Sequence, residues 1–323
     1  MNKQELTGPR IRPCTDSTMI QCLTDSMTRP LNAVVIIDKP SGMTSHDVVH
    51  RVRRILGQRS VGHLGTLDPM ATGVLPLVLG NFTRLAQFYL HSEKTYEGVI
   101  RFGFATDTYD ADGETTSAQQ HVALSTADLH RLAAKFRGLI EQMPPPFSAK
   151  KINGVPAYKL ARKKKDVPLK PVQVEVKELE IIKFENSCAH FRSRVASGTY
   201  LRSIAHDLGQ AAGCGAHLQS LRRTAVAEFT LNDSHTFEEL DQAMRGGEAA
   251  LEEIFVHPRK LLPLLPSVSA TDENVARIRH GQTVNLPEFS AAREVKVFGG
   301  QRGLLAIVIR IAGTLFQPRI VLS

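Results

Sequence analysis

The sequence has no apolar run long enough to cross a membrane, although 42% of its 323 residues are hydrophobic. A membrane-spanning helix needs about 20 consecutive apolar residues. The first thirty residues also lack the apolar core of a secretory signal, because Glu5, Asp16 and Asp25 are mixed there with lysine and arginine. We therefore expect a cytoplasmic protein without a membrane partner, in which residues 1–31 form a disordered N-terminal extension.

Cysteine is scarce as well, with four residues at positions 14, 22, 188 and 214. They form neither a CxxC pair nor a Cys/His spacing typical of zinc sites, so we expect no disulfide framework and no structural zinc. The acidic segment 106–114, TDTYDADGE, partly resembles a calcium loop but lacks the glutamate that such a loop needs further downstream. The sequence thus predicts no metal site and no cofactor.

The chain also lacks a βαβ alternation and a solenoid repeat. A short apolar run predicts a strand at 33–38, and alternating apolar residues predict strands at 96–104, 172–184 and 189–195. Amphipathic patterns predict helices at 45–56, 82–90, 125–138, 202–213, 237–245 and 248–255, the first of them capped by Ser45 and ended by Gly57. The apolar run 74–79 is too short to assign. These elements predict an α+β fold with a mixed, largely antiparallel sheet and flanking helices.

A second, smaller domain is predicted at the C-terminal end, because 323 residues exceed what one hydrophobic core usually serves. Prolines at 258, 263 and 266 mark the boundary. After them come one short helix pattern at 272–279 and three strand patterns at 294–298, 303–311 and 314–322. We expect a main domain at 32–260 and a β-rich domain at 265–323.

Positive charge is concentrated in one segment. The net charge is +8, and residues 150–170 contain eight basic residues against the single acid Asp166. A charge run is usually only a solvated surface. Because this one also contains Gly154, Pro156 and Tyr158, it better fits a projecting arm, 143–170, that grips the phosphates of a nucleic acid. The lysines expected to contact the RNA backbone are Lys150, Lys151, Lys163, Lys164 and Lys165.

The segment 61–80, VGHLGTLDPMATGVLPLVLG, places one carboxylate, Asp68, on a turn. Pro69 favours an extended conformation at Asp68. Gly62, Gly65 and Gly73 permit turns and the close approach of another backbone, which a substrate-facing loop needs. An isolated Asp-Pro pair would be read as an ordinary turn.

These residues belong to an ordered set of motifs that resembles the TruB family of tRNA pseudouridine synthases. The motifs, in chain order, are IDKPSGMTSHD (37–47), GHLGTLDPMATGVLP (62–76), KTYEGVIRFG (94–103), TDTYDADG (106–113), GTYLRSIAHDLG (198–209) and GCGAHLQSLRR (213–223). The resemblance covers residues 33 to about 230. From about residue 267, including HGQTVNLP, the chain resembles a PUA domain, an RNA-binding module.

The resemblance implies the pseudouridine synthase fold and an isomerase that flips out the uridine at position 55 of the tRNA T-loop and re-attaches its base through carbon. Asp68 matches the family's catalytic carboxylate, and Arg202 matches the cation that pairs with it. Whether this aspartate attacks C1′, attacks C6 or assists removal of a proton is left open. Breaking a glycosidic bond with a carboxylate needs neither a metal nor a redox cofactor.

The resemblance also implies the residues that bind the substrate. Tyr96 and Tyr200 match tyrosines beside the target base and ribose, with Tyr96 counted among the catalytic residues. His63 matches a residue that contacts the rearranged T-loop, and Leu221 matches an apolar wall of the uracil pocket. Lys39 matches a lysine to which we assign a supporting role. Phe147 departs from the family, which commonly has tyrosine there.

Two other functions are compatible with the sequence. One is the catalytic subunit of a guide-RNA pseudouridylation particle, whose core motif is similar but which depends on guide RNA and partner proteins. The other is a tRNA-binding or tRNA-folding protein without catalysis. The basic segment favours an enzyme that acts on tRNA alone, with no obligate protein partner.

Overall fold

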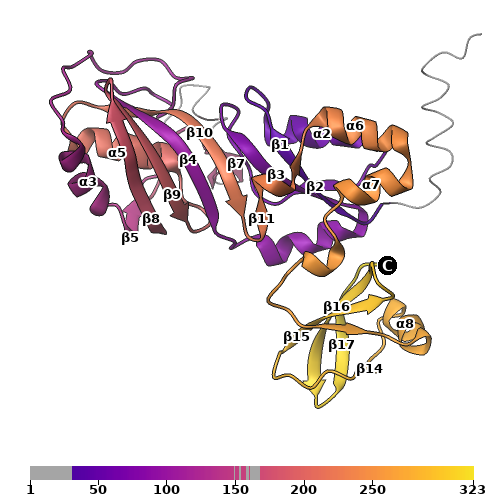
Figure 1. Cartoon of the computed structure of the whole chain (residues 1–323). Helices are drawn as coiled ribbons and strands as arrows, with labels where there is room; N and C mark the ends of the chain where they lie inside the picture. The colour runs from indigo at the N-terminus through magenta and orange to yellow at the C-terminus, as the bar shows by residue number, and fades with distance from the viewer. Residues whose placement is uncertain (1–30, 149, 153, 158–159, 161–167) are drawn as a thin grey trace, which may run out of the picture.

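The computed structural model describes residues 31–148, 150–152, 154–157, 160 and 168–323 (Figure 1). It contains a large sheet with helices and a smaller C-terminal sheet with one helix. The predicted N-terminal extension, apart from its last residue, lies outside the described residues. Lys163, Lys164 and Lys165 of the basic arm also lie outside them.

Within the described part of the chain, ten strands form the large sheet, in the order β12-β1-β3-β10-β4-β9-β8-β5, with β2 paired to β3 and β11 paired to β10. The pairs β1–β12 and β3–β10 are parallel, and the other pairs are antiparallel. The predicted mixed, largely antiparallel sheet is therefore confirmed. Its strands are β1 (Val34–Lys39), β2 (Val61–His63), β3 (Thr72–Leu79), β4 (Lys94–Phe102), β5 (Gly138–Gln142), β8 (Val172–Glu185), β9 (Cys188–Val195), β10 (Ala216–Val226), β11 (Phe229–Thr230) and β12 (Ser234–His235).

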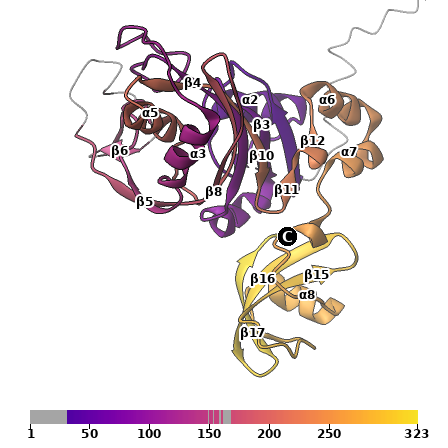
Figure 2. The same cartoon turned by 60° about the vertical axis from the view of Figure 1, so that its left-hand side comes forward.

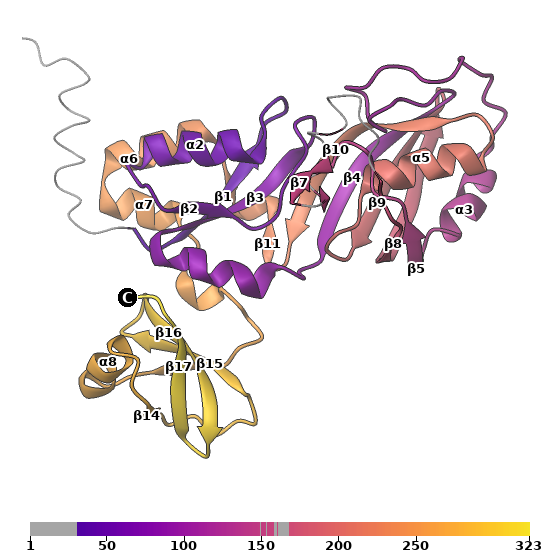
Figure 3. The same ribbon diagram turned by 180° about the vertical axis from the view of Figure 1, so that it is seen from behind.

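Helices cover one face of this sheet in two groups. Figures 1 and 3 show α2 (Ser45–Ile55), α6 (Phe237–Gly246) and α7 (Glu248–Ile254) at one end, and α3 (Thr126–Ala134) and α5 (Leu201–Ala211) at the other. Their apolar residues share one buried core with inward-facing strand residues such as Tyr96, Ile100 and Phe102 of β4. Burying alternate strand residues is what the period-2 pattern of β4 predicts.

One predicted detail of the helices is wrong. The residue that caps α2 is Thr44, whose hydroxyl accepts a hydrogen bond from the Asp47 amide. Ser45 instead points inward, where its hydroxyl accepts a hydrogen bond from the Leu67 amide at 2.8 Å and so ties the helix to the Asp68 loop. The helix expected at 82–90 is present and is the 3-10 helix η1 (Gly80–Tyr89). Gly57, with a φ of 60°, follows the end of α2 as expected.

The C-terminal region forms a separate five-stranded sheet, among the described residues, in the order β13-β15-β16-β17-β14 (Figure 2). Its three long strands and its helix confirm the elements predicted there. The elements are β13 (Ser267–Ser269), α8 (Asp272–Arg279), β14 (Val284–Asn285), β15 (Glu294–Gly299), β16 (Gly303–Ala312) and β17 (Leu315–Val321). The domain limits at 260 and 265 stay predictions.

The C-terminal sheet packs against η1 on the face of the large sheet opposite to the helices. Phe82 and Leu85 of η1 share an apolar core with Ile307 and Leu322. The Arg84 guanidinium of η1 also donates a hydrogen bond to the Val321 carbonyl at 2.7 Å. Thus η1 lies between the two sheets. Among the described residues, no helix is long and apolar enough to span a membrane.

The start of the basic arm forms a small hairpin of β6 (Lys151–Ile152) and β7 (Val155–Pro156). After the hairpin, the structure describes Ala157, Leu160 and then the chain from Pro168 onward. Short 3-10 turns, η2 (Leu231–Asp233) and η3 (Pro258–Lys260), connect the remaining elements.

Candidate active site

The loop that carries Asp68 connects β2 to β3 and is held in place by backbone contacts. The Gly42 amide donates a hydrogen bond to the Pro69 carbonyl at 2.9 Å, and the Ala71 amide donates one to the Asp68 carbonyl at 3.1 Å. Gly73, the second residue of β3, has a φ of 101°, and a Cβ there would lie 2.2 Å from the Arg223 carbonyl oxygen. Glycine is therefore required for the loop to pass so close to β10.

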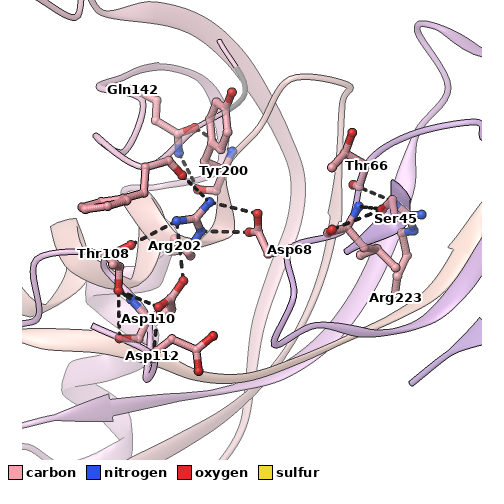
Figure 4. A network of polar contacts seen from close by, with 12 residues as sticks. Ser45, Thr66, Asp68, Thr108, Asp110, Asp112, Gln142, Tyr200, Arg202 and Arg223 are labelled. Carbon is pink, nitrogen blue, oxygen red and sulfur yellow. Dashed lines mark hydrogen bonds and ion pairs between the residues drawn. The ribbon is translucent and has the colours of Figure 1, made fainter. Parts of the chain in front are cut away.

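Asp68 and Arg202 form the ion pair that the sequence predicts. Arg202 Nε lies 2.8 Å from Asp68 Oδ2, and Arg202 Nη2 lies 3.0 Å from Asp68 Oδ1 (Figure 4). This bidentate geometry fixes the orientation of the carboxylate. The Arg202 side chain is 5% exposed, whereas that of Asp68 is 33% exposed. The arginine is thus embedded, and the carboxylate faces the pocket.

Three further groups hold the Arg202 guanidinium. It donates hydrogen bonds to the carbonyls of Thr108 at 3.1 Å and Phe147 at 3.0 Å, and its Nη1 lies 3.5 Å from Asp110 Oδ2. Burial raises the pKa of Asp110, while the hydrogen bond from Thr108 and the charge of Arg202 act in the opposite direction. Because Phe147 contributes only its backbone carbonyl here, phenylalanine in place of tyrosine leaves this contact unchanged.

A pocket of about 340 Å³ opens above the ion pair. This volume falls within the range of about 300 to 1,000 Å³ that is usual for small-molecule sites. Six of the residues singled out from the sequence line it: His63, Asp68, Tyr96, Tyr200, Arg202 and Leu221. The motifs that are far apart in the chain therefore meet at one place. A larger crevice of about 760 Å³ shares Leu221 with this pocket and contains neither member of the ion pair.

The walls of the pocket are mostly apolar. Tyr96 and Leu221 are buried residues on neighbouring strands, β4 and β10. Burial raises the pKa of the Tyr200 phenol. Burial is also the main cause of the lowered pKa of His63, with the charge of Arg223 adding to it. The His63 ring is therefore neutral near pH 7, and its Nδ1 is buried without a hydrogen-bond partner among the described residues.

Lys39 lies outside the pocket, beneath the Asp68 loop. Its buried ammonium donates hydrogen bonds to the carbonyls of Pro40, Met43 and Pro69. The contact with Pro69, at 3.1 Å, ties the residue that follows Asp68 to the end of β1. This geometry fits the supporting role that was expected for Lys39.

Sequence reasoning missed Arg223, which is fully buried under the loop. Its guanidinium donates hydrogen bonds to the carbonyls of Gly65 at 3.0 Å, Thr66 at 3.2 Å and Val74 at 2.8 Å. The signal was present: Arg223 is two residues after Leu221 on a strand, so both side chains point to the same face. An arginine at an inward-facing strand position needs buried acceptors, and the Asp68 loop supplies them.

Lys94 is a second pocket residue that the sequence did not single out. Its pKa is lowered to about 8, first by burial and then by the charge of Arg223. Of the predicted arm lysines, Lys150 is partly buried and donates a hydrogen bond to the Lys170 carbonyl at 3.4 Å, and the backbone of Lys151 lies in β6. Neither lines the pocket.

Solved structures share this fold. One is the structure of an H/ACA RNP bound to a substrate RNA containing 2'-deoxyuridine, with a TM-score of 0.67 and 25% identity over 90% of this chain and 85% of that chain. Another is a Cbf5-Nop10-Gar1 complex, with a TM-score of 0.66 and 25% identity over the same shares. The large mixed sheet and its arrangement of helices therefore define a pseudouridine synthase fold.

Matches to protein-family models identify the family to which the chain belongs among proteins with the pseudouridine synthase fold. Residues 53–201 match the N-terminal domain of the TruB family pseudouridylate synthases, and residues 202–264 match the C-terminal domain of tRNA pseudouridylate synthase B. A tRNA pseudouridine synthase B from Solibacter usitatus is 48% identical over 90% of this chain and all of that protein. One from Geotalea uraniireducens is 39% identical over 83% of this chain and 86% of that protein. The chain belongs to the TruB family.

Proposed function

We propose that this chain converts the uridine at position 55 of the tRNA T-loop to pseudouridine, with Asp68 as the catalytic carboxylate. The observation that carries the proposal is the bidentate pair of Asp68 with the buried Arg202 at the base of a mostly apolar pocket. The buried arginine holds this carboxylate in one orientation through two hydrogen bonds and directs it toward the pocket.

The reaction needs such a carboxylate. The bond between N1 of uracil and C1′ of ribose breaks, and a bond between C5 and C1′ forms, with the C5 proton released to solvent. An ionised Asp68 can act as a nucleophile or as a base in these steps. In both roles it must touch the nucleotide, and its 33% exposed side chain faces the pocket where the nucleotide would lie.

The target nucleotide must leave its stack to reach this carboxylate. We assign Tyr96 and Leu221 to contacts with the flipped base, because both are buried at the wall of the pocket. Tyr200 then lies beside the base or ribose. His63, at the pocket edge and neutral, is assigned to the T-loop.

Other parts of the chain are assigned to the rest of the tRNA. The basic arm, 143–170, with Lys150, Lys151, Lys163, Lys164 and Lys165, supplies phosphate contacts, as its charge favours. The domain at 265–323 is assigned as a PUA-like RNA-binding domain next to the catalytic domain at 32–260. We infer that the enzyme acts on free tRNA in the cytoplasm without a protein partner.

The decisive experiment uses an unmodified tRNA transcript labelled with tritium at C5 of uridine. The wild type should release tritium from this transcript and none from a transcript in which the uridine at position 55 is replaced by cytidine. Asp68→Asn should abolish release while thermal unfolding stays near that of the wild type. Asp112→Asn, an exposed carboxylate in the neighbouring loop, is the matched control and should remain active. Full release by Asp68→Asn would refute the assignment.

The same assay separates the two alternatives. Release that occurs only when a guide RNA is added would favour a guide-dependent subunit. Binding of tRNA without any release by the wild type would favour a tRNA-folding protein.

A further inference from the structure

The loop 106–113, TDTYDADG, supplies two of the groups that hold Arg202. They are the Thr108 carbonyl, 3.1 Å from Nη1, and the Asp110 carboxylate, 3.5 Å from the same atom. The loop is also tied to β10, because the Leu218 amide donates to the Tyr109 carbonyl at 2.9 Å and the Ala111 amide donates to the Leu218 carbonyl at 3.0 Å. The orientation of Arg202 therefore depends on the conformation of this loop.

Tyr109, which lies between Thr108 and Asp110, has an unusual backbone. Its φ is 66°, in the left-handed region that residues other than glycine rarely adopt. Such a conformation persists only where surrounding contacts hold it. The backbone hydrogen bond from the Leu218 amide is one such contact, and a contact of the tyrosine side chain can add to it.

The Tyr109 ring has that contact with His206 of α5. The two rings are stacked, with centroids 3.8 Å apart and planes inclined by 15°. His206 lies four residues after Arg202, one turn along the same face of the helix. The stack thus joins the loop to the helix that carries Arg202, next to the two loop groups that Arg202 contacts.

The surroundings of His206 fit a stacking role better than a polar one. Its Nδ1 is buried and has no hydrogen-bond partner among the described residues. Burial lowers the pKa of His206, so the ring is neutral, and burial raises the pKa of the Tyr109 phenol. Neither ring lines the pocket that contains Asp68.

We infer that Tyr109 and His206 are positioning residues for the isomerisation, which act through their stacked rings to hold the 106–113 loop against Arg202 and so to fix Asp68. This inference rests on the proposed function. It assigns a role to two side chains that lie outside the pocket but support both contacts of Arg202 with the loop.

The test compares variants that keep the stack with variants that remove it. Tyr109→Gly tolerates the left-handed backbone but has no ring, and His206→Ala has no ring either. Tyr109→Phe and His206→Phe keep an aromatic face. His130→Ala, an exposed histidine of α3, is the matched control for His206→Ala. Each variant is assayed for tritium release from the C5-labelled tRNA transcript, with kcat and KM measured separately, and for thermal unfolding.

If the inference is right, Tyr109→Gly and His206→Ala lower kcat by about 10- to 100-fold, the range expected from small displacements in an active site. Their KM for tRNA stays near the wild-type value. The Phe variants retain most of the activity, and the double variant Tyr109→Gly/His206→Ala loses little more than either single variant, because both substitutions remove the same stack.

Two results would overturn the inference while the proposed function stands. One is wild-type kcat in Tyr109→Gly and His206→Ala. The other is a raised KM with unchanged kcat, which would mean that the rings contact RNA. An inactive wild type would instead refute the proposed function itself, so the two failures are distinguishable.

Discussion

Replacing Arg202 by lysine tests whether the geometry of the ion pair matters beyond its charge. Arg202 donates four hydrogen bonds: two to Asp68 and one each to the carbonyls of Thr108 and Phe147. A lysine ammonium keeps the positive charge but has three donors and cannot form the bidentate contact. At least one hydrogen bond to Asp68 is therefore absent in this variant.

The size of the effect follows from that missing hydrogen bond. A hydrogen bond to a charged group contributes about 1.5 to 3 kcal/mol. If the bond acts in the transition state, its absence corresponds to a roughly 10- to 150-fold lower rate, at about 1.4 kcal/mol for each factor of ten. Asp68 is one-third exposed, so solvent screens part of the interaction and the lower half of this range is expected.

The assay is single-turnover tritium release from the C5-labelled tRNA transcript, with enzyme in excess so that product release does not limit the rate. Arg222→Lys is the matched control, because Arg222 also binds a carboxylate, Asp38, with two nitrogens. That pair is more exposed, with 41% of the Arg222 side chain accessible, and lies outside the pocket. A rate for Arg202→Lys close to that of the wild type, or an equally reduced rate in both variants, would refute the reasoning.

Three other predictions concern charge. The pKa of Lys94 is about 8 in the folded protein and 10.5 in an exposed lysine, so between these values the unfolded chain holds the additional proton. Denaturation should show the wild type gaining stability relative to Lys94→Met as the pH rises through this window; a constant difference would contradict it. Lys296 is buried and donates to the carbonyls of Arg259 and Leu261, so Lys296→Met should lower the free energy of unfolding by about 1 to 3 kcal/mol, whereas the exposed Lys183→Met should not. Replacing Lys163, Lys164 and Lys165 by alanine should weaken tRNA binding and flatten its dependence on salt by about one unit for each phosphate that is no longer neutralised, and an unchanged slope would exclude that role.

The fold was largely predictable because its strands alternate between a buried and an exposed face. The pattern that begins at Tyr96 predicted β4, and the paired patterns after Val172 predicted β8 and β9. The strand β3 could not be assigned from sequence, because it lies between two covered faces and is apolar at nearly every position. Ser45 was misassigned because a serine at a helix start usually caps it, whereas here Thr44 does so and Ser45 binds the Asp68 loop.

Residues of the candidate site could be predicted only where they belong to a motif that resembles the family. Asp68 and Arg202 are 134 positions apart, and no periodicity connects them; their pairing followed from the resemblance. Arg223 and the Tyr109–His206 stack were missed for a different reason. Arg223 binds carbonyls of the distant Asp68 loop, and Tyr109, which has a left-handed backbone, stacks on the distant His206. Contacts between distant segments leave no local pattern in the sequence.

The position of η1 has a consequence for exchanging parts between relatives. Ala86 and Tyr89 of this 3-10 helix line the pocket, while Phe82 and Arg84 contact the C-terminal sheet. A chimera that replaces only residues 265–323 would therefore place a foreign surface against the back of the active-site wall. A functional graft should carry residues 80–89 together with the C-terminal region, so the transferable unit is discontinuous in the sequence.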